Sequence, residues 1–319
     1  MSVFGGSDLF NGFLVLYTDN IMTDICCIGH ITHDKIITPQ STTELNGGTS
    51  FYFSYGISKL PGVSYKLVTS LAEKDLAAVA RMRDAGIDVD VIPSRETVFF
   101  ENKYGENMNN RQQRVLAKAD SFTVEKLGGV EARFIHLGSL LADDFSLDVI
   151  KALSGRGKLS VDAQGFLRNV DGVEVYPCDW SNKVEALRYI DILKVNEHEI
   201  VSLTGHSDLR QAAHQLAAWG VGEVLMTLGS YGSVIFAEGE FCESPAFAPM
   251  QLVDATGCGD TYATGYLYMR AKGAGYEEAG RFAAAIATLN LEKTGPFDGT
   301  LGDVEQVLCS REAKKFGLI

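Results

Sequence analysis

The chain has 319 residues, and 46% of them are hydrophobic, which is enough apolar material for one large α/β domain. Acidic residues outnumber basic ones by 41 to 28, and the net charge of −13 excludes nucleic acid and anionic membranes as main partners, because both require a surplus of Lys and Arg. The six cysteines have no metal-binding spacing, and no apolar run approaches the roughly 20 residues that cross a bilayer, so we expect a cytoplasmic protein with reduced cysteines.

Residues 1–21 show no repeating pattern, and we expect them to be an extension or a remnant in front of a domain over 22–319. The first core strand is predicted at 24–29, where a continuous apolar run ends in glycine, as in a buried parallel strand. Asp34 lies just beyond it. Ligands of open α/β sheets collect at the carboxyl ends of strands, so Asp34 is a candidate for binding substrate hydroxyls, with a solvated loop acid as the alternative.

Gly47 and Gly48 open a predicted helix over 49–60, where they either admit a ligand close to the backbone or only form a turn. Strand and helix follow over 64–86, as in a βαβ unit. Strand-like alternation broken by turns then predicts a small antiparallel sheet from about 33–46 and 88–114. Such a sheet could cover a substrate as a lid, and its open edges could pair with a second copy in a homodimer.

Strands and helices alternate again in the middle of the chain. Strands are predicted at 132–140, 158–167 and 191–198, and helices at 145–153, 183–190 and 206–220, with Asp143 or Asp144 as a cap of the first helix. The strand over 191–198 brings Asn196 and Glu199 to its carboxyl end, three residues apart. Their oxygen atoms suit Mg²⁺, directly or through water, and helix capping is the competing explanation.

A strand, a tight turn and a second strand are predicted over 223–236. Thr227, Gly229 and Gly232 lie at this turn, where they could contact a nucleotide or simply form the hairpin. An alanine-rich helix over 277–290 follows, and a Gly-Pro pair at 295–296 stops it.

The most informative stretch is Asp254-Ala-Thr-Gly-Cys-Gly-Asp260, which opens a helix predicted to run to about Lys272. A glycine-rich helix start aims unpaired backbone N–H groups and the positive end of the helix dipole at one spot, and such a spot holds an anion. Gly257 and Gly259 let a phosphate approach the main chain. A carboxylate here would repel the anion, so we expect Asp260 to accept a proton from a hydroxyl that attacks the held phosphoryl group. An ordinary helix-start acid is the alternative.

Taken together, Gly47-Gly48, Asn196-x-x-Glu199 and Asp254-x-Thr-Gly-x-Gly-Asp260 resemble, in order and spacing, the motifs of the ribokinase-like (PfkB) carbohydrate kinases over residues 22 to about 308. The resemblance implies a doubly wound, mostly parallel α/β sheet flanked by helices, with a small β-sheet lid. It also implies ATP-dependent phosphorylation of a hydroxyl on a sugar or cyclic polyol, with Mg²⁺ as cofactor, and it leaves a contribution from a monovalent cation open.

The resemblance also assigns roles to individual residues. Asp260 looks like the catalytic base, and the backbone of Gly257, Cys258 and Gly259 looks like the anion hole. The donor side is implied to contain Asn196, Glu199, Thr227, Gly229, Gly232, Asp254 and, near adenine, Asn290, with Glu199 holding the metal through water. The acceptor side is implied to contain Asp34, Gly47, Gly48 and Tyr52.

Three positions depart from the family's pattern. Thr49 and Tyr52 stand where Lys and Asn commonly contact the substrate, which predicts an altered and more aromatic pocket, and Cys258 replaces a common alanine. Because Phe51, Tyr52 and Phe53 could stack on a base, a nucleoside kinase of the same family is an alternative. A non-catalytic sensor of sugar or nucleotide is a second one, although a binding module has no use for a proton acceptor beside a phosphate.

Overall fold

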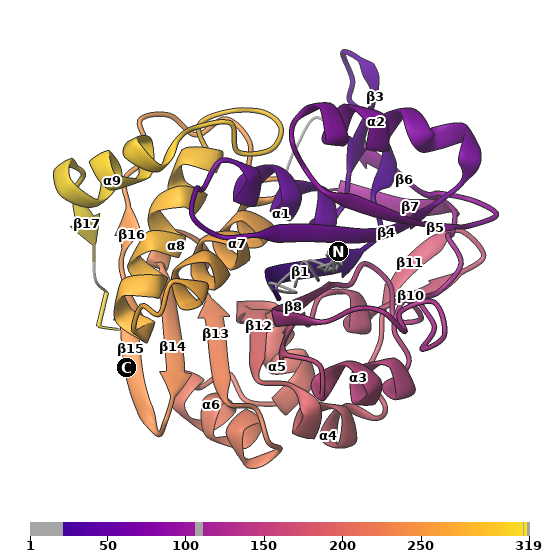
Figure 1. The fold of residues 1–319 in the computed structure, drawn as a ribbon. Coiled ribbons are helices and arrows are strands. Elements are labelled where there is room, and N and C mark those ends of the chain that lie inside the picture. Colours follow the sequence, from indigo (N-terminus) through magenta and orange to yellow (C-terminus); the bar gives the residue numbers. More distant parts are fainter. Residues whose placement is uncertain (1–21, 106–110, 315, 318–319) are drawn as a thin grey trace, which may run out of the picture.

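The structure is a computed structural model that describes residues 22–105, 111–314 and 316–317 (Figure 1). The extension expected over residues 1–21 lies outside this part of the chain. A layer of helices covers each face of one large sheet, and a smaller sheet stands beside it. In the described residues, every helix is too short or too polar to reach across a bilayer.

A nine-stranded sheet forms the centre of the fold. Seven neighbouring strands run parallel, and two more add an antiparallel edge. In spatial order they are β15 (Glu240–Ser244), β14 (Ser233–Ala237), β13 (Glu223–Thr227), β12 (Ile192–Asn196), β9 (Lys158–Asp162), β8 (Ala132–Gly138), β1 (Thr23–Gly29), β4 (Tyr65–Leu71) and β5 (Val89–Pro93). The strand order grows outward in both directions from β1 and β8, which confirms the predicted doubly wound sheet.

Helices cover both faces of this sheet. One face carries α1 (Thr49–Ser58), α2 (Leu76–Asp84), α7 (Cys258–Ala271), α8 (Tyr276–Asn290) and α9 (Leu301–Ser310), and the other carries α3 (Leu147–Ser154), α4 (Lys183–Ala186), α5 (Glu197–Thr204) and α6 (Leu209–Ala218). The cap expected for α3 is wrong. Ser146 caps this helix by accepting a hydrogen bond from the Val149 amide at 3.3 Å, whereas Asp144 is buried and accepts two amides of the preceding loop.

Successive side chains of the central strands enter two separate cores, as the two-residue period of a strand requires. In β1, Ile25 and Cys27 face the core beneath α1, α7 and α8, and Cys26 and Ile28 face the core above α3 to α6. Burial on both faces explains why this strand is an unbroken apolar run.

The small sheet has six strands in the order β10 (Arg168–Asp171), β11 (Glu174–Pro177), β7 (Arg111–Ala117), β6 (Val98–Tyr104), β2 (Thr32–Ile37) and β3 (Thr42–Gly47). The hairpin of β10 and β11 had no strand prediction. Residues 89–93, expected in this sheet, form β5 instead, because they pair with β4 from Leu67↔Val89 to Leu71↔Pro93. Pro93, which has no N–H, is tolerated there because β5 is an edge strand. A separate two-stranded sheet consists of β16 (Ala246–Phe247) and β17 (Ala313–Lys314).

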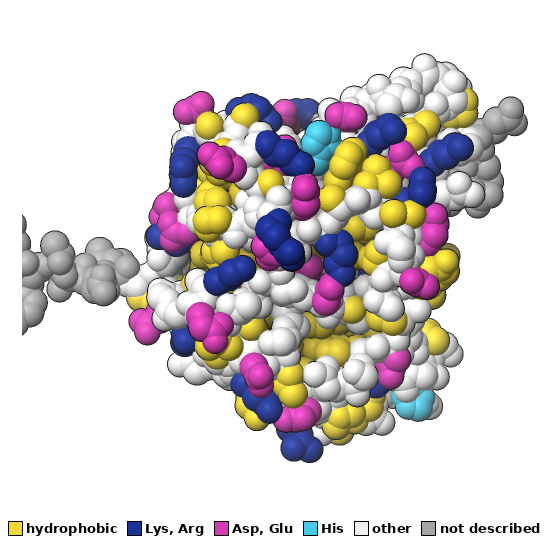
Figure 2. Space-filling model, turned by 90° about the vertical axis from the view of Figure 1, so that its right-hand side faces the viewer, with side chains coloured by type: hydrophobic (Ala, Val, Ile, Leu, Met, Phe, Trp, Pro, Cys, Tyr) yellow, Lys and Arg dark blue, Asp and Glu magenta, His cyan; other side chains and the backbone are white. Residues whose placement is uncertain are grey.

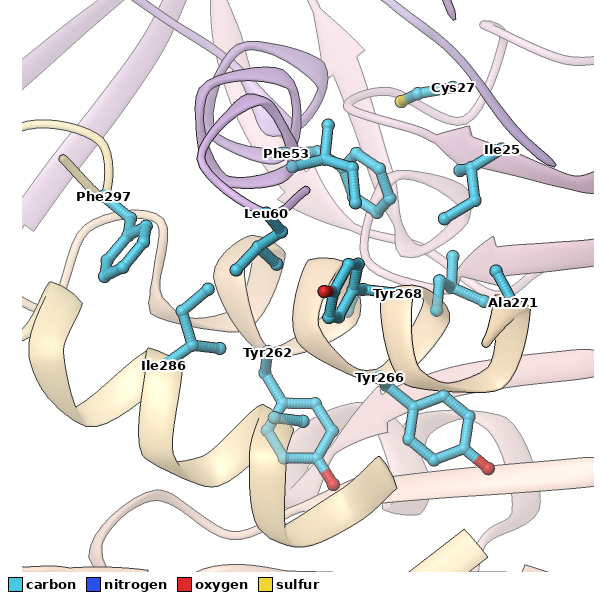
Figure 3. Close-up of a cluster of buried hydrophobic side chains, with 14 of the residues drawn as sticks. Ile25, Cys27, Phe53, Leu60, Tyr262, Tyr266, Tyr268, Ala271, Ile286 and Phe297 are labelled. Atoms are coloured by element: carbon cyan, nitrogen blue, oxygen red, sulfur yellow. The ribbon is translucent and has the colours of Figure 1, made fainter. Parts of the chain in front are cut away.

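Helix α7 is fixed in the core by three buried tyrosines, Tyr262, Tyr266 and Tyr268 (Figure 3). Their rings pack among apolar side chains, and each hydroxyl finds a partner: Tyr262 shares a hydrogen bond with Ser233, Tyr266 donates to Glu223 and Tyr268 donates to a backbone carbonyl. The start of this helix is therefore held rigidly against the sheet.

Positive and negative side chains are mixed on one face of the molecule (Figure 2). Figure 2 shows one face of the molecule, on which Lys and Arg alternate with Asp and Glu instead of gathering into a basic patch. This distribution agrees with the acidic composition, and it means that positive potential for an anionic ligand must be concentrated locally.

Candidate active site

Helix α7 begins without a side-chain cap. Gly257 is its N-cap residue, with φ 74° and ψ 2°, and the first hydrogen bond within the helix runs from the Thr261 amide to the Gly257 carbonyl at 2.8 Å. The Cys258 amide is used inside the loop, where it donates to the Ala255 carbonyl at 3.2 Å. The amides of Gly259 and Asp260 meet no acceptor among the described residues, so two donors stay open at the positive end of the helix.

Several contacts fix the loop in front of this helix. One Asp254 carboxylate oxygen accepts the Thr256 amide at 2.9 Å, and the Asn290 side-chain amide donates to the Thr256 carbonyl at 3.0 Å. The Tyr52 ring packs directly on Gly257, where an added Cβ would lie 2.0 Å from a ring carbon. Only glycine accommodates both the positive φ and this ring.

The Asp260 carboxyl has a perturbed pKa. Asp260 is only partly exposed, and desolvation together with the nearby Asp162 carboxylate raises its pKa to about 7, although Lys194, Arg168 and a hydrogen bond from Thr49 act in the opposite direction. A carboxyl with a pKa near neutrality is suited to proton transfer. Thr49 was expected in the substrate pocket but not as a partner of Asp260, and the sequence had not pointed to these charged neighbours.

Lys194 and Asp162 form a buried ion pair under the loop. They occupy paired positions on β12 and β9, their Nζ and Oδ2 atoms lie 2.7 Å apart, and their side chains are 7% and 2% exposed. A Cβ on Gly259 would lie 3.0 Å from the Lys194 Nζ atom, so this ammonium lies directly beneath the open amides. A lysine inside the apolar run of β12 was the sequence signal that could have revealed the pair.

Asn196 and Glu199 cap α5 through a reciprocal capping box. The Asn196 Oδ1 atom accepts the amides of His198 and Glu199, each at 2.9 Å, while the Glu199 carboxylate accepts the backbone and side-chain amides of Asn196 at 2.8 and 2.7 Å. Burial and Asp162 raise the pKa of Glu199. The pair is therefore a helix cap in this structure, whatever further role it has.

The predicted donor-side residues come from neighbouring segments. Asn196 pairs with Thr227 at the ends of β12 and β13, and the 3₁₀ turn Gly229–Tyr231 follows immediately. Gly229 and Gly232 both have positive φ, and Gly232 packs against the Ser244 carbonyl, where a Cβ would lie at 2.4 Å. Asn290 is 2% exposed, so its contribution to donor binding would come through the loop that it holds and not through contact with a base.

The predicted acceptor-side residues lie on the opposite flank. A Cβ on Gly47 would lie 2.3 Å from an Asp34 carboxylate oxygen, and Gly48 is the N-cap of α1 with φ 94°. The carboxylates of Asp254, Asp260 and Asp34, after desolvation, raise the pKa of the Tyr52 hydroxyl, which therefore lies between the two flanks. Hydroxyl-binding candidates and Asp260 thus converge at one place.

The three consecutive aromatic residues do not line one pocket. Phe53 is fully buried and stacks on His136 at 4.8 Å, Tyr52 is 5% exposed beneath the Gly257 loop, and Phe51 packs against Tyr55. Consecutive helical residues point about 100° apart, so they cannot form one stacking platform. The aromatic argument for a nucleoside acceptor therefore loses its basis.

Comparison with known proteins agrees with this geometry. The family described as pfkB family carbohydrate kinase matches residues 80–300. Cytidine kinase from Thermococcus kodakarensis is 26% identical over 297 residues, which cover 88% of this chain and 100% of the relative.

Two solved structures share the fold. A pyrophosphate-dependent kinase in the ribokinase family, complexed with a pyrophosphate analogue and myo-inositol, is 31% identical with a TM-score of 0.79, over 88% of this chain and 99% of that one. Arabidopsis thaliana ribokinase, complexed with ribose and ATP, is 23% identical with a TM-score of 0.75, over 91% and 99% of the two chains. Because the family match spans more than half of its length, this chain belongs to the pfkB family of carbohydrate kinases.

Proposed function

We propose that this kinase transfers a phosphoryl group from ATP to a hydroxyl of a cyclic polyol or sugar. The observation that carries the proposal is the juxtaposition of two open amides, at Gly259 and Asp260, with a carboxyl whose pKa is about 7. Amides can hold the transferred phosphoryl oxygens, while the carboxylate takes a proton from the acceptor.

The reaction requires one proton transfer and one displacement at phosphorus. The Asp260 carboxylate accepts the proton of the acceptor hydroxyl while the hydroxyl oxygen attacks the terminal phosphorus of the donor. The bond from that phosphorus to the bridging oxygen breaks, and the leaving phosphate keeps the electron pair. The Gly259 and Asp260 amides and the dipole of α7 stabilise the negative charge on the phosphoryl oxygens in the transition state. Gly257 and Cys258 shape the loop that presents them.

Mg²⁺ fits this site only as an ion that arrives with the donor. Among the described residues no group of three or more His, Cys, Asp and Glu side chains forms a cation cage. The Glu199 carboxylate accepts hydrogen bonds from Asn196 on both oxygens but keeps lone pairs for water, so it would hold the ion through water. When bound, Mg²⁺ would neutralise charge on the donor phosphates.

Pyrophosphate is the second candidate donor. The 31% identical relative solved with a pyrophosphate analogue and myo-inositol supports both this donor and a cyclic polyol acceptor of the inositol type. A nucleoside is the second candidate acceptor, because some relatives are named as nucleoside kinases, among them the cytidine kinase at 26% identity. The buried positions of Phe53 and Tyr52 favour the polyol.

The test is a crossed panel of donors and acceptors with the purified full chain. ATP and pyrophosphate are each paired with inositols, sugars, sugar phosphates and nucleosides, and phosphorylated products are separated and identified by phosphorus NMR. We expect transfer to an inositol or another cyclic polyol. Preferential phosphorylation of nucleosides would reject the acceptor that we propose. Binding of donor and polyol without any product would reject the kinase activity and support a sensor.

A further inference from the structure

We propose that Lys194, held by Asp162, is a positioning residue of the phosphoryl site: its buried ammonium lies under the Gly259 amide and attracts the phosphoryl group during transfer. The inference rests on the proposed function. It goes further because it assigns a role to an ion pair that lies outside the motifs which identify the family.

The geometry places the charge where the anion must be. The Lys194 Nζ atom would lie 3.0 Å from a Cβ on Gly259, and Lys194 is the one Lys or Arg that is buried in the described part of the chain. The absence of a side chain at Gly259 leaves the room that this ammonium occupies. Gly259 thus contributes an open backbone amide, and its lack of a side chain lets the Lys194 ammonium lie close to that amide.

The charge balance of the site explains why a cation is needed. Asp162, Glu199 and Asp260 bring three carboxyl groups to the place where a polyanionic donor must bind, in a chain of net charge −13. Lys194 interacts electrostatically with all three. Fixed charges in a partly dehydrated site act more strongly than in water, so one ammonium there changes the affinity for phosphate substantially.

A purely structural role is the competing explanation. Buried ion pairs contribute little net stability, because desolvation offsets their attraction, and neutral pairs of similar shape often replace them without loss. Removing one partner, by contrast, leaves an unpaired buried charge and destabilises the fold. A double substitution that removes both charges therefore separates the two explanations.

The experiment compares Lys194→Met, Asp162→Asn and the double variant in the full chain, with the donor and acceptor found by the panel. The double variant should recover most of the thermal stability that Lys194→Met loses, while kcat stays about 10²-fold below wild type, the scale for losing one anion-stabilising donor. The matched control is the other deeply placed pair, Arg270 and Glu223, 2.9 Å apart, whose double variant Arg270→Met/Glu223→Gln should keep its kcat. A Lys194→Met/Asp162→Asn variant with kcat within about 3-fold of wild type would reduce the pair to a structural element.

The pH profile gives a readout that a structural role would not move. The groups that face Asp260 are Asp162 on β9, Lys194 on β12, Arg168 on β10, Cys27 on β1, Thr49 and Tyr52 on α1, and Cys258 on α7. Loss of the ammonium should move the acidic limb of kcat/KM to higher pH, and Asp162→Asn should move it to lower pH. Shifts of both variants in one direction would overturn the assignment.

Binding of inorganic pyrophosphate, measured by calorimetry, needs no turnover. We expect the double variant to bind it about 10-fold more weakly than wild type, and equal binding would overturn the inference. This arm also separates two failures. A wild-type chain that phosphorylates nothing defeats the proposed function, whereas unchanged pyrophosphate binding in the double variant defeats only the role of Lys194.

Discussion

Two helices of this kinase begin at the same end of the main sheet, and they begin in opposite ways. Helix α5 starts at Asn196, whose side chain and that of Glu199 occupy the first amides reciprocally. Helix α7 starts at Gly257, which offers no side chain, and its amides at Gly259 and Asp260 meet no acceptor in the described part of the chain. The first N–H groups of a helix need partners, and in α5 the helix's own side chains supply them. In α7 we propose that a ligand supplies them.

The difference explains which start is suited to bind the transferred group. At a capped start the first amides already donate to side chains of the same helix. Helix α5 can therefore affect an anion only through water or through the Glu199 carboxylate. An uncapped start can hold an anion, and the neighbouring Asp260 carboxyl, whose pKa is raised, is suited to accept a proton. Substitutions at α7 should therefore damage catalysis, and substitutions at α5 should mainly damage stability.

The largest effect is expected for Asp260→Asn. We expect kcat to fall by about 10²- to 10⁴-fold, because a carboxamide cannot accept the hydroxyl proton. The variant should still fold, and its folded state should be more stable than that of the wild type. The pKa of Asp260 in the fold is about 7, above the ordinary 3.8, so ionisation of Asp260 opposes folding progressively as pH rises from about 4 to 7 and fully above that. Asparagine removes this effect, so the thermal midpoint at pH 8 should rise. Near-normal turnover would end the general-base role.

The next effect is expected for Gly259→Val. A Cβ here approaches the Lys194 ammonium at 3.0 Å, so the branched side chain crowds the space that this ammonium occupies beside the open amides. We expect kcat to fall by about 10²-fold while the acceptor still binds, as measured by kinetics and calorimetry. Gly155→Val is the control, because Gly155 has a negative φ and no atom within 4 Å of an added Cβ. Equal loss of catalysis and acceptor binding in Gly259→Val would count against an anion site at this glycine.

A third effect concerns pH in the unmodified protein. With an Asp260 pKa of about 7, the carboxylate is the active form, so kcat/KM should rise with pH through neutrality and at pH 6 should be about 10-fold below its plateau. The capped Glu199 should not produce this limb, which can be checked with Glu199→Gln. A flat profile between pH 5 and 8 would show that no group with this pKa limits the reaction.

The α7 start could be predicted from sequence because its signal is local. Glycines and acids within seven residues determine the backbone of the loop, and the order of strands follows from apolar runs. The Lys194 and Asp162 pair was much harder to predict, because the two residues are 32 apart in the chain and meet only through the register of β12 with β9. Its one trace was a lysine within an apolar strand.

Two other predictions failed for reasons of geometry. The alternative that Phe51, Tyr52 and Phe53 stack on a base does not hold for all three, because successive residues of a helix face different directions and Phe53 belongs to the core. Residues 89–93 have the alternation of a half-exposed strand, and only their pairing with β4 decides which sheet they join. Local pattern predicts that a strand exists more reliably than it predicts the partner.

The smallest effect is expected at α5, for Asn196→Ala. The substitution removes an acceptor that serves the His198 and Glu199 amides, so the free energy of unfolding should fall by about 1 kcal/mol, as for other helix caps. Asn196→Ser is the matched control, because a serine hydroxyl can still accept a helix amide without placing a second carboxylate against Glu199. Denaturant unfolding and kcat should be measured together on both variants. A kcat loss in Asn196→Ala as large as that of Gly259→Val, at unchanged stability, would mean that α5 binds the donor directly and that the contrast between the two helix starts is wrong.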